Sequence, residues 1–210
     1  MKCIIFANGC YGDLERYREI IKDADMIICA DGGANYACKL GAIPSVVIGD
    51  MDSITDKSRN YLTELGVKFK KYPIHKDFTD LQLSLEIAEE SGADIIILLG
   101  TLGNRLDHTM ANIFSGMEMA LRGKNIVHYG SDCIIYLVTH ELILKGSKGD
   151  LVSVITMSDR AVGVTETGME YPLHEALLEN SKPYAVSNVM EGEQARITVR
   201  EGVLAVFHYR

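Results

Sequence analysis

Residues 95–108 read IIILLGTLGNRLDH, an apolar run that ends in a polar stretch containing glycine. Five consecutive apolar residues without alternation are typical of a strand that is covered on both faces, as in a parallel sheet. Parallel strands are joined by crossover connections that usually contain a helix. The stretch therefore favours an α/β fold in which similar strands alternate with helices.

The first 123 residues show this alternation. Strands are expected at residues 3–7, 26–30, 46–48, 68–72 and 95–99. Helices are expected between and after them, at residues 14–22, 33–40, 56–65, 80–91 and 108–121. Strands that alternate with helices predict a doubly wound, mostly parallel sheet.

The pattern changes after Gly123. Short strand-like runs follow one another at residues 133–139, 141–144, 151–157, 195–200 and 203–209, and turn sequences such as KGSKGD and REGV lie among them. Consecutive short strands predict an antiparallel sheet or a small sandwich. We therefore expect an α/β domain over residues 1–123 and an antiparallel β-sandwich domain over residues 124–210.

The composition limits the classes of partner. A chain of 210 residues that is 47% apolar can bury a hydrophobic core, and its net charge of −8 argues against a nucleic-acid surface, which needs a basic face. The five cysteines form no C-x-x-C pair, and no apolar run reaches signal-peptide or transmembrane length. We expect a soluble cytoplasmic protein that binds neither nucleic acid nor membrane.

Polar residues follow all five predicted strands of the first domain. Ligands bind at the carboxyl ends of the strands in an open parallel sheet. Four of the five strand ends carry carboxylates, so we expect an acidic crevice there. The polar residues at these ends are Asn8; Asp31 and Asn35; Asp50, Asp52 and Ser53; Lys76, Asp77, Thr79 and Asp80; and Thr101, Asn104, Arg105, Asp107 and His108.

Asp50 and Asp52 stand one residue apart, directly after a predicted buried strand. Two carboxylates about 4 Å apart repel each other by about 4 kcal/mol at an effective dielectric constant of about 20. A cation between them would relieve this repulsion, and oxygen ligands with room for substrate phosphates suit Mg²⁺. Because turns are also rich in aspartate, it is the second acidic loop nearby that favours a metal site.

The stretch TDLQLSLEIA at residues 79–88 predicts the start of a helix. Thr79 and Gln82 fit a T-x-x-Q capping box. Asp80 then lies in the first turn, where the helix dipole stabilises its charge by roughly 0.3–1 kcal/mol. Lys76, just before this helix, is either a solvated surface lysine or a partner of a polyphosphate.

The loop at residues 100–108 is not a Walker A loop, because the GxxxxGK[ST] pattern is absent. The ADGGAN stretch at residues 30–35 likewise lacks the GxGxxG spacing of dinucleotide-binding folds. Arg105 offers a forked donor that suits phosphate oxygens. His108 begins a predicted helix, as a structural histidine or as a ligand contact, and no role is predicted for the other, scattered histidines.

Four motifs in order closely resemble those of the bacterial-type thiamin pyrophosphokinases. They are ADGGAN at residues 30–35, GDMDS at 49–53, KDFTD at 76–80 and GTLGNRLDH at 100–108. The resemblance runs over the whole chain and continues through GMEYPL at residues 168–173 and the pair Ser187 and Asn188. It implies an α/β nucleotide domain followed by a β-sandwich, assembled as a homodimer.

The resemblance implies Mg²⁺-dependent transfer of a diphosphate group from ATP to the hydroxyl of thiamin, which gives thiamin diphosphate and AMP. The catalytic residues it implies are Asp50, Asp52, Asp80 and Arg105, with the three aspartates as metal ligands. The nucleotide-binding residues it implies are Asp31, Asn35, Lys76, Asp77, Thr79, Gln82, Thr101, Asn104, Arg105, Asp107, His108 and Asn112.

The resemblance also implies that Ser187 and Asn188 bind thiamin, in a pocket completed at the dimer interface. Some members of the family stack a tryptophan on the thiamin ring, but this chain contains no tryptophan. Tyr171 and Tyr184 lie in segments that suit this role.

Two other functions stay open at this point. A metal-dependent glycosyltransferase also uses an Asp-x-Asp pair on a nucleotide diphosphate, but it leaves KDFTD and GTLGNRLDH unexplained. A thiamin or nucleotide sensor without catalysis could keep the fold, although it would have little reason to keep a full metal cluster. Release of AMP from ATP in the presence of thiamin distinguishes all three.

Overall fold

The computed structural model describes residues 1–73, 77–103 and 105–210. The chain divides into two compact units. Unit 1 contains residues 1–116 and 128–131, and unit 2 contains residues 117–127 and 132–210. Strand β6 (Asn125–Tyr129) has residues in both units. The domain boundary expected between residues 123 and 124 stays a prediction.

Unit 1 contains a parallel sheet in the strand order β5-β1-β2-β3-β4. All four strand pairs are parallel, so the predicted parallel sheet is confirmed. Strand β1 pairs with β2 on one side and with β5 on the other, and its Ile5 lies opposite Ile28 of β2 and Leu98 of β5. The strands are β1 (Lys2–Phe6), β2 (Met26–Ala30), β3 (Val46–Gly49), β4 (Lys68–Lys71) and β5 (Ile95–Leu99).

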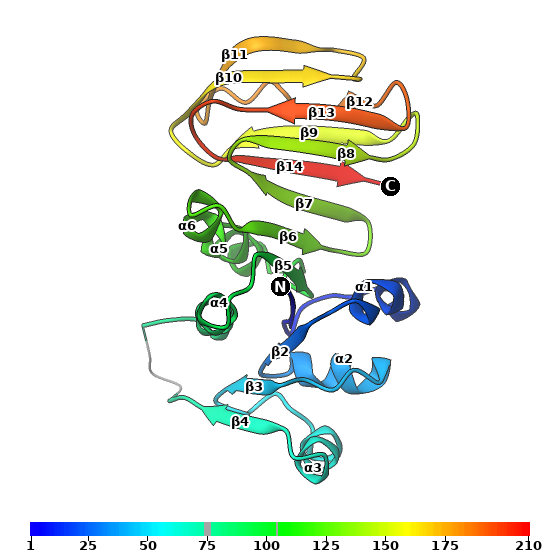
Figure 1. Cartoon of the computed structure of the whole chain (residues 1–210), viewed down its shortest axis with the longest axis vertical. Helices are drawn as coiled ribbons and strands as arrows, with labels where there is room; N and C mark the ends of the chain where they lie inside the picture. The colour runs from blue at the N-terminus through cyan, green and yellow to red at the C-terminus, as the bar shows by residue number, and fades with distance from the viewer. Residues whose placement is uncertain (74–76, 104) are drawn as a thin grey trace. The chain divides into compact units, whose positions relative to one another are not determined.

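Helices cover both sides of this sheet, with α1, α2 and α3 on one side and α4 on the other (Figure 1). This is the predicted doubly wound arrangement. The helical elements of unit 1 are the 3₁₀ turn η1 (Leu14–Tyr17), α1 (Arg18–Lys22), α2 (Gly33–Leu40), α3 (Asp56–Glu64), α4 (Asp80–Glu90) and α5 (Leu106–Ser115).

One predicted helix is wrong in its extent. The single helix expected over residues 108–121 consists of α5, which ends before Gly116, and a separate helix α6 (Met117–Leu121) in unit 2. Glycine has a low helix propensity because it loses the most backbone freedom in a helix, so an interruption at Gly116 is physically reasonable.

Unit 2 contains two antiparallel sheets, in the orders β12-β9-β14-β7 and β11-β10-β13-β8. Buried apolar side chains from both form one core, for example Val154 and Val206 from the first sheet and Val164 and Ile197 from the second. The predicted antiparallel sandwich is therefore confirmed. Its strands are β7 (Cys133–Val138), β8 (Glu141–Lys145), β9 (Leu151–Thr156), β10 (Arg160–Thr167), β11 (Leu173–Glu179), β12 (Asn188–Val189), β13 (Gln194–Thr198) and β14 (Leu204–Tyr209).

The sequence did not predict strands β6, β10, β11 and β12. Strand β11 reads LHEALLE, which is made largely of good helix formers. Strand formation depends on cross-strand neighbours more than on intrinsic preference, and β10 supplies the neighbour here.

Within the described parts of the chain, no helix has the length and apolar character needed to cross a membrane.

Candidate functional site

Three carboxylates converge at the carboxyl ends of strands β2 and β3. Asp31 follows β2, and Asp50 and Asp52 follow β3. One carboxylate oxygen from each residue lies within 4.8 Å of the others. The parallel pairing explains this proximity, because the Asp31 N–H donates to the Ile48 carbonyl at 2.7 Å and so ties the two strand ends together.

The backbone of this acidic cluster is strained. Asp31 and Met51 adopt positive φ angles of 44° and 71°, which are uncommon for residues other than glycine. Such conformations cost about 1–3 kcal/mol each and persist only where the surrounding structure enforces them. The left-handed turn at Met51 lets the Asp52 N–H donate to Oδ1 of Asp50 at 3.1 Å, so both carboxylates belong to one tight loop.

Gly49 leaves the space that this loop needs. A Cβ atom at this position would lie 2.9 Å from Cβ of Asp31 and 3.3 Å from Cγ of Asp80. The first distance is shorter than real Cβ contacts allow, so only glycine fits without displacing Asp31. The second distance shows that the carboxyl group of Asp80 also lies beside this strand end.

The electrostatics of the cluster favour a cation. Burial raises the pKa of Asp31, a residue that is 8% exposed, and the charges of Asp50 and Asp52 raise this pKa further. Hydrogen bonds from Ser53 and the Gly32 N–H lower it only partly. Oδ1 of Asp31 is buried and has no hydrogen-bond partner in the part of the chain that the structure describes. A buried, unpartnered oxygen among carboxylates fits an oxygen-liganded divalent cation such as Mg²⁺.

Asn35 ties the acidic loop to helix α2. Its Nδ2 donates to the Ser53 carbonyl at 2.9 Å, and its Oδ1 accepts from the Thr55 N–H at 3.0 Å. The Thr55 side chain in turn caps helix α3. Asn35 was predicted to bind nucleotide, and in the structure its side chain contacts this loop.

The predicted capping box is confirmed at the start of α4. The Gln82 N–H donates to Oγ1 of Thr79 at 3.2 Å, and the Thr79 N–H donates to Oε1 of Gln82 at 2.9 Å. Both side chains therefore have a structural role. Asp80 is the first residue of α4 and is partly buried beside Gly49, but it does not belong to the group that converges within 4.8 Å.

The loop after β5 contains the buried Thr101 and leads to exposed polar residues at the start of α5. Thr101 is buried, and its carbonyl accepts from Nδ2 of Asn112 at 2.8 Å. Arg105 and Asp107 pair with each other at 2.6 Å, which lowers the pKa of Asp107, and both are exposed, as is His108. These residues lie near one another at the start of α5.

Three further nucleotide-binding residues were predicted, and the structure describes one of them, Asp77. Asp77 is exposed. Lys76 and Asn104 lie outside the described residues.

The sequence predicts no role for His128, and the structure places it beside Thr101. This histidine lies in β6 and is fully buried, and its Nδ1 is 2.9 Å from Oγ1 of Thr101. Burial lowers its pKa to about 4, so the ring is neutral at pH 7. The single histidine in the strand sequence NIVHY was the only signal, and such a residue is usually structural.

In unit 2, Asn188 fixes the backbone of Tyr171. Oδ1 of Asn188 accepts from the Tyr171 N–H at 3.0 Å, and Nδ2 donates to the Tyr171 carbonyl at 2.8 Å. Tyr171 itself is 65% exposed. Ser187 adopts a positive φ of 59°, and its N–H donates to Oγ of Ser153 at 2.9 Å.

Sequence reasoning also missed Glu166, which lies beneath Asn188. Glu166 is 1% exposed, and its Oε2 accepts from Nδ2 of Asn188 at 3.3 Å. Burial raises its pKa to about 7, and the hydrogen bond from Asn188 opposes this effect. Oε1 has no partner among the described residues. No local pattern in the sequence RAVGVTET distinguishes this glutamate from a surface one.

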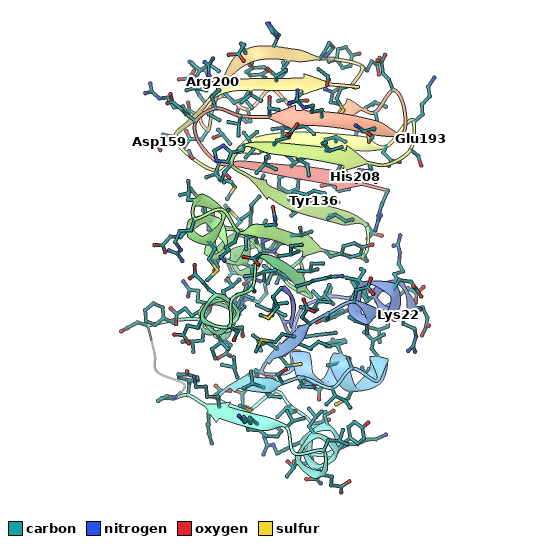
Figure 2. All side chains as sticks on the ribbon, in the orientation of Figure 1. Lys22, Tyr136, Asp159, Glu193, Arg200 and His208 are labelled. Atoms are coloured by element: carbon teal, nitrogen blue, oxygen red, sulfur yellow. The ribbon has the colours of Figure 1, made fainter. Side chains whose placement is uncertain are left out.

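A second polar pair in unit 2 joins the buried His208 to Asp150. Nε2 of His208 lies 2.7 Å from Oδ2 of Asp150, and His208 is fully buried. Figure 2 shows His208 on β14 and Tyr136 on the neighbouring strand β7. His208 is buried on β14, whereas Asp150, which directly precedes β9, is partly exposed.

Comparison with known protein families accounts for both units. A family model described as "Thiamin pyrophosphokinase, catalytic domain" matches residues 17–128. A second, described as "Thiamin pyrophosphokinase, vitamin B1 binding domain", matches residues 139–204. The chain belongs to the thiamin pyrophosphokinase family. The resemblance inferred from the four sequence motifs is therefore confirmed.

Individual members of the thiamin pyrophosphokinase family are similar in sequence to this chain over most of its length. "Thiamine pyrophosphokinase 1" of Oryza sativa subsp. japonica is 30% identical over 88% of this chain and 80% of its own length. "Thiamine pyrophosphokinase" of Bacillus subtilis is 27% identical over 84% of each chain. The crystal structure of the Bacillus subtilis enzyme superposes with a TM-score of 0.85 at 25% identity, over 100% of this chain and 99% of that one.

Proposed function

We propose that this protein is a thiamin pyrophosphokinase that transfers a diphosphate group from ATP to thiamin. The thiamin hydroxyl oxygen forms a bond to the β-phosphorus of ATP, and the bond from that phosphorus to the bridging oxygen of the α-phosphate breaks. The products are thiamin diphosphate and AMP. The observation that carries the proposal is the acidic cluster of Asp31, Asp50 and Asp52 at the carboxyl edge of the parallel sheet, in a chain of this family.

We propose that the acidic cluster holds Mg²⁺, with Asp80 as a further ligand from the start of α4. A bound Mg²⁺ supplies positive charge to the phosphate oxygens. The protein side of the reaction is then positioning and charge stabilisation, as in other phosphoryl transfers. The strained loop at Met51 supports this view, because strain of this kind concentrates at functional sites. A carboxylate of the cluster is the candidate acceptor for the hydroxyl proton.

The remaining predicted nucleotide residues keep their proposed roles around this cluster. Asn112 of α5 forms a hydrogen bond with the carbonyl of Thr101, which follows β5 at the edge of the sheet where ligands of parallel sheets bind. Arg105 and His108 are exposed near the start of α5, and Arg105 would exchange its ion pair with Asp107 for one with a phosphate group. The roles of Lys76 and Asn104 rest on the sequence motifs alone.

We propose that Ser187 and Asn188 belong to the thiamin-binding segment and that Tyr171 supplies the aromatic contact. The double hydrogen bond from Asn188 supports this assignment, since a buried amide is used to fix the backbone of one exposed tyrosine. We also propose a homodimer. Three exposed apolar side chains of unit 2 support an interface there, namely Leu177, Tyr184 and Val186.

We propose that the protein works in the cytoplasm. Its five cysteines are all free thiols, which is compatible with a reducing compartment.

The proposed function is tested by incubating the protein with ATP, Mg²⁺ and thiamin while AMP and thiamin diphosphate are measured together. Equal amounts of both are expected. Asp52→Asn is expected to abolish their formation, and Asp56→Asn is a matched control, because Asp56 is an exposed carboxylate in the first turn of α3. Formation of ADP would contradict the proposal, and thiamin binding without any product would indicate a sensor.

A further inference from the structure

A hollow of about 360 Å³ adjoins the acidic loop in unit 1. It is lined by the end of β3, by helix α3 and by strand β4, through the residues Asp50, Met51, Arg59, Thr63, Phe69 and Lys71. Its volume lies within the range of roughly 300–1,000 Å³ that small-molecule sites occupy. None of the four sequence motifs includes Arg59, Thr63, Phe69 or Lys71.

Arg59 contributes a positive charge that forms no ion pair with a carboxylate among the described residues. Its Nη2 donates to the Met51 carbonyl, so Arg59 holds the strained residue between Asp50 and Asp52. Nε is buried and has no hydrogen-bond partner within the described ranges, where Arg59 also forms no ion pair. A guanidinium group stays protonated in proteins. Arg59 therefore places a permanent positive charge between the acidic loop and the hollow.

Lys71 adds a second positive charge on the wall of the hollow. Side chains alternate between the two faces of a strand, so Phe69 and Lys71 face the same side of β4 and Lys70 faces the other. Phe69 is partly buried against the core, whereas Lys71 is exposed. The hollow thus has an apolar wall at Phe69, two cationic groups, and the carboxylate of Asp50 on the side of the acidic loop.

These charges suit an anion of the phosphate type. Mg²⁺ carries two positive charges, which do not balance a triphosphate, and further cations are needed wherever its phosphate groups lie. Arg105, the cation predicted for this purpose, is paired with Asp107 at 2.6 Å. Arg59 and Lys71 line the hollow together with Asp50, and neither forms an ion pair among the residues that the structure describes.

We propose that this hollow is an oxyanion subsite, in which Arg59 and Lys71 bind a phosphate group next to the metal-binding loop. The identification of that phosphate as part of ATP rests on the proposed function. Arg59 has a second role as a positioning residue, since it holds Met51 in its left-handed conformation. The side chain of Lys71 forms no hydrogen bond among the described residues, so its substitution tests phosphate binding without disturbing Met51.

The subsite is tested by calorimetric titration of the full chain with inorganic pyrophosphate in the presence of Mg²⁺. Lys71→Gln is expected to weaken binding by about 5–10-fold, which is about 1 kcal/mol. Lys70→Gln is the matched control, with the same change of charge on the opposite face of β4, and should weaken binding by less than about 2-fold. Equal effects of the two substitutions would overturn the subsite.

Arg59→Lys separates charge from hydrogen-bond geometry. It keeps the positive charge but loses the forked donor, so pyrophosphate binding should fall by more than about 10-fold. Thermal melting and Mn²⁺ binding to the protein without nucleotide serve as controls for the fold and the acidic loop. Unchanged pyrophosphate affinity in a folded Arg59→Lys variant would overturn the role of Arg59 in the subsite.

Kinetics with ATP and thiamin identify the source of the phosphate group. Lys71→Gln should raise the KM for ATP by about the same factor as the loss of pyrophosphate affinity and leave the KM for thiamin unchanged. If pyrophosphate binding depends on Lys71 but the wild-type protein forms no thiamin diphosphate, the subsite is supported and the proposed function fails. If turnover is normal and Lys71 affects neither ligand, the subsite fails and the proposed function survives.

Discussion

Asp31 in unit 1 and Glu166 in unit 2 are both buried carboxylates, and each has one oxygen without a partner among the described residues. Burial raises the pKa of both. Their neighbours differ, because Asp31 faces the carboxylates of Asp50 and Asp52, whereas Glu166 faces the amide of Asn188. The first environment adds negative charge and calls for a cation. The environment of Glu166 offers one hydrogen-bond donor, the amide of Asn188, and Glu166 can become neutral by binding a proton.

The comparison shows that burial alone does not define a metal site. A lone buried carboxylate can become neutral by taking a proton, and Glu166 does so near neutral pH. Three carboxylates whose oxygens converge within 4.8 Å need a positive charge that lies between them. The number of neighbouring charges therefore decides which kind of site a buried carboxylate forms.

The largest expected effect follows from removing one charge of the acidic cluster. Asp31→Asn and Asp52→Asn should each reduce thiamin diphosphate formation by at least about 10³-fold, or about 4 kcal/mol. Without Mg²⁺, Asp31→Asn should raise the melting temperature, because it removes a buried charge beside two like charges. Added Mg²⁺ should then stabilise the wild-type protein more than the variant. Equal stabilisation of both would exclude Asp31 as a ligand.

The second effect concerns the pH dependence of stability at Glu166. Its pKa rises from an ordinary 4.5 to about 7 in the folded protein, so its favourable contribution is complete below pH 4.5 and is lost as the pH rises through 7. Between pH 5 and 8 the wild-type protein should lose stability, on the order of 3 kcal/mol, relative to Glu166→Gln. Melting temperatures of both proteins across this range measure the difference. Parallel curves would show that Glu166 does not titrate there.

The third prediction concerns a substitution that displaces Asp31 without removing its charge. Gly49→Ala puts a methyl group 2.9 Å from Cβ of Asp31 and should lower activity by about 10²-fold, or about 2.7 kcal/mol. Gly41→Ala is the matched control, because Gly41 also has a positive φ but has no atom within 4 Å of the new Cβ. The control should lose stability only. Similar activities in both variants would mean that the position of Asp31 is not critical.

The smallest effect tests how firmly Asp80 is held beside the cluster. Thr79→Ala removes the acceptor of the capping box at the start of α4 and should cost about 1 kcal/mol of stability. For a chain of this length, that loss lowers the melting temperature by about 2–4 °C. Thr79→Ser keeps the oxygen and should stay close to the wild type. A loss of Mg²⁺ affinity in Thr79→Ala but not in Thr79→Ser would indicate that the cap also positions Asp80.

Much of the fold could be predicted because its signals are local. The apolar run at residues 95–99 and the alternation of strands with helices depend on neighbouring residues, and so does the capping box of Thr79 and Gln82. The aspartates of the GDMDS motif could be predicted to lie together for the same reason. Strands β10 and β11 could not be predicted, since their pairing partners are distant or their composition favours a helix.

The sequence by itself determined the parallel architecture, the family resemblance and the pair of aspartates after β3. The sequence placed Asp31 at the same edge of the sheet, but only the tertiary structure showed its carboxylate within 4.8 Å of theirs, because the register of β2 against β3 sets where the two strand ends meet. The hydrogen bond from Asn188 to Glu166 likewise joins residues 22 positions apart, and the contact of His128 with Thr101 joins residues 27 positions apart. Such contacts depend on packing across strands, and no local pattern of residues encodes the burial that shifts a pKa.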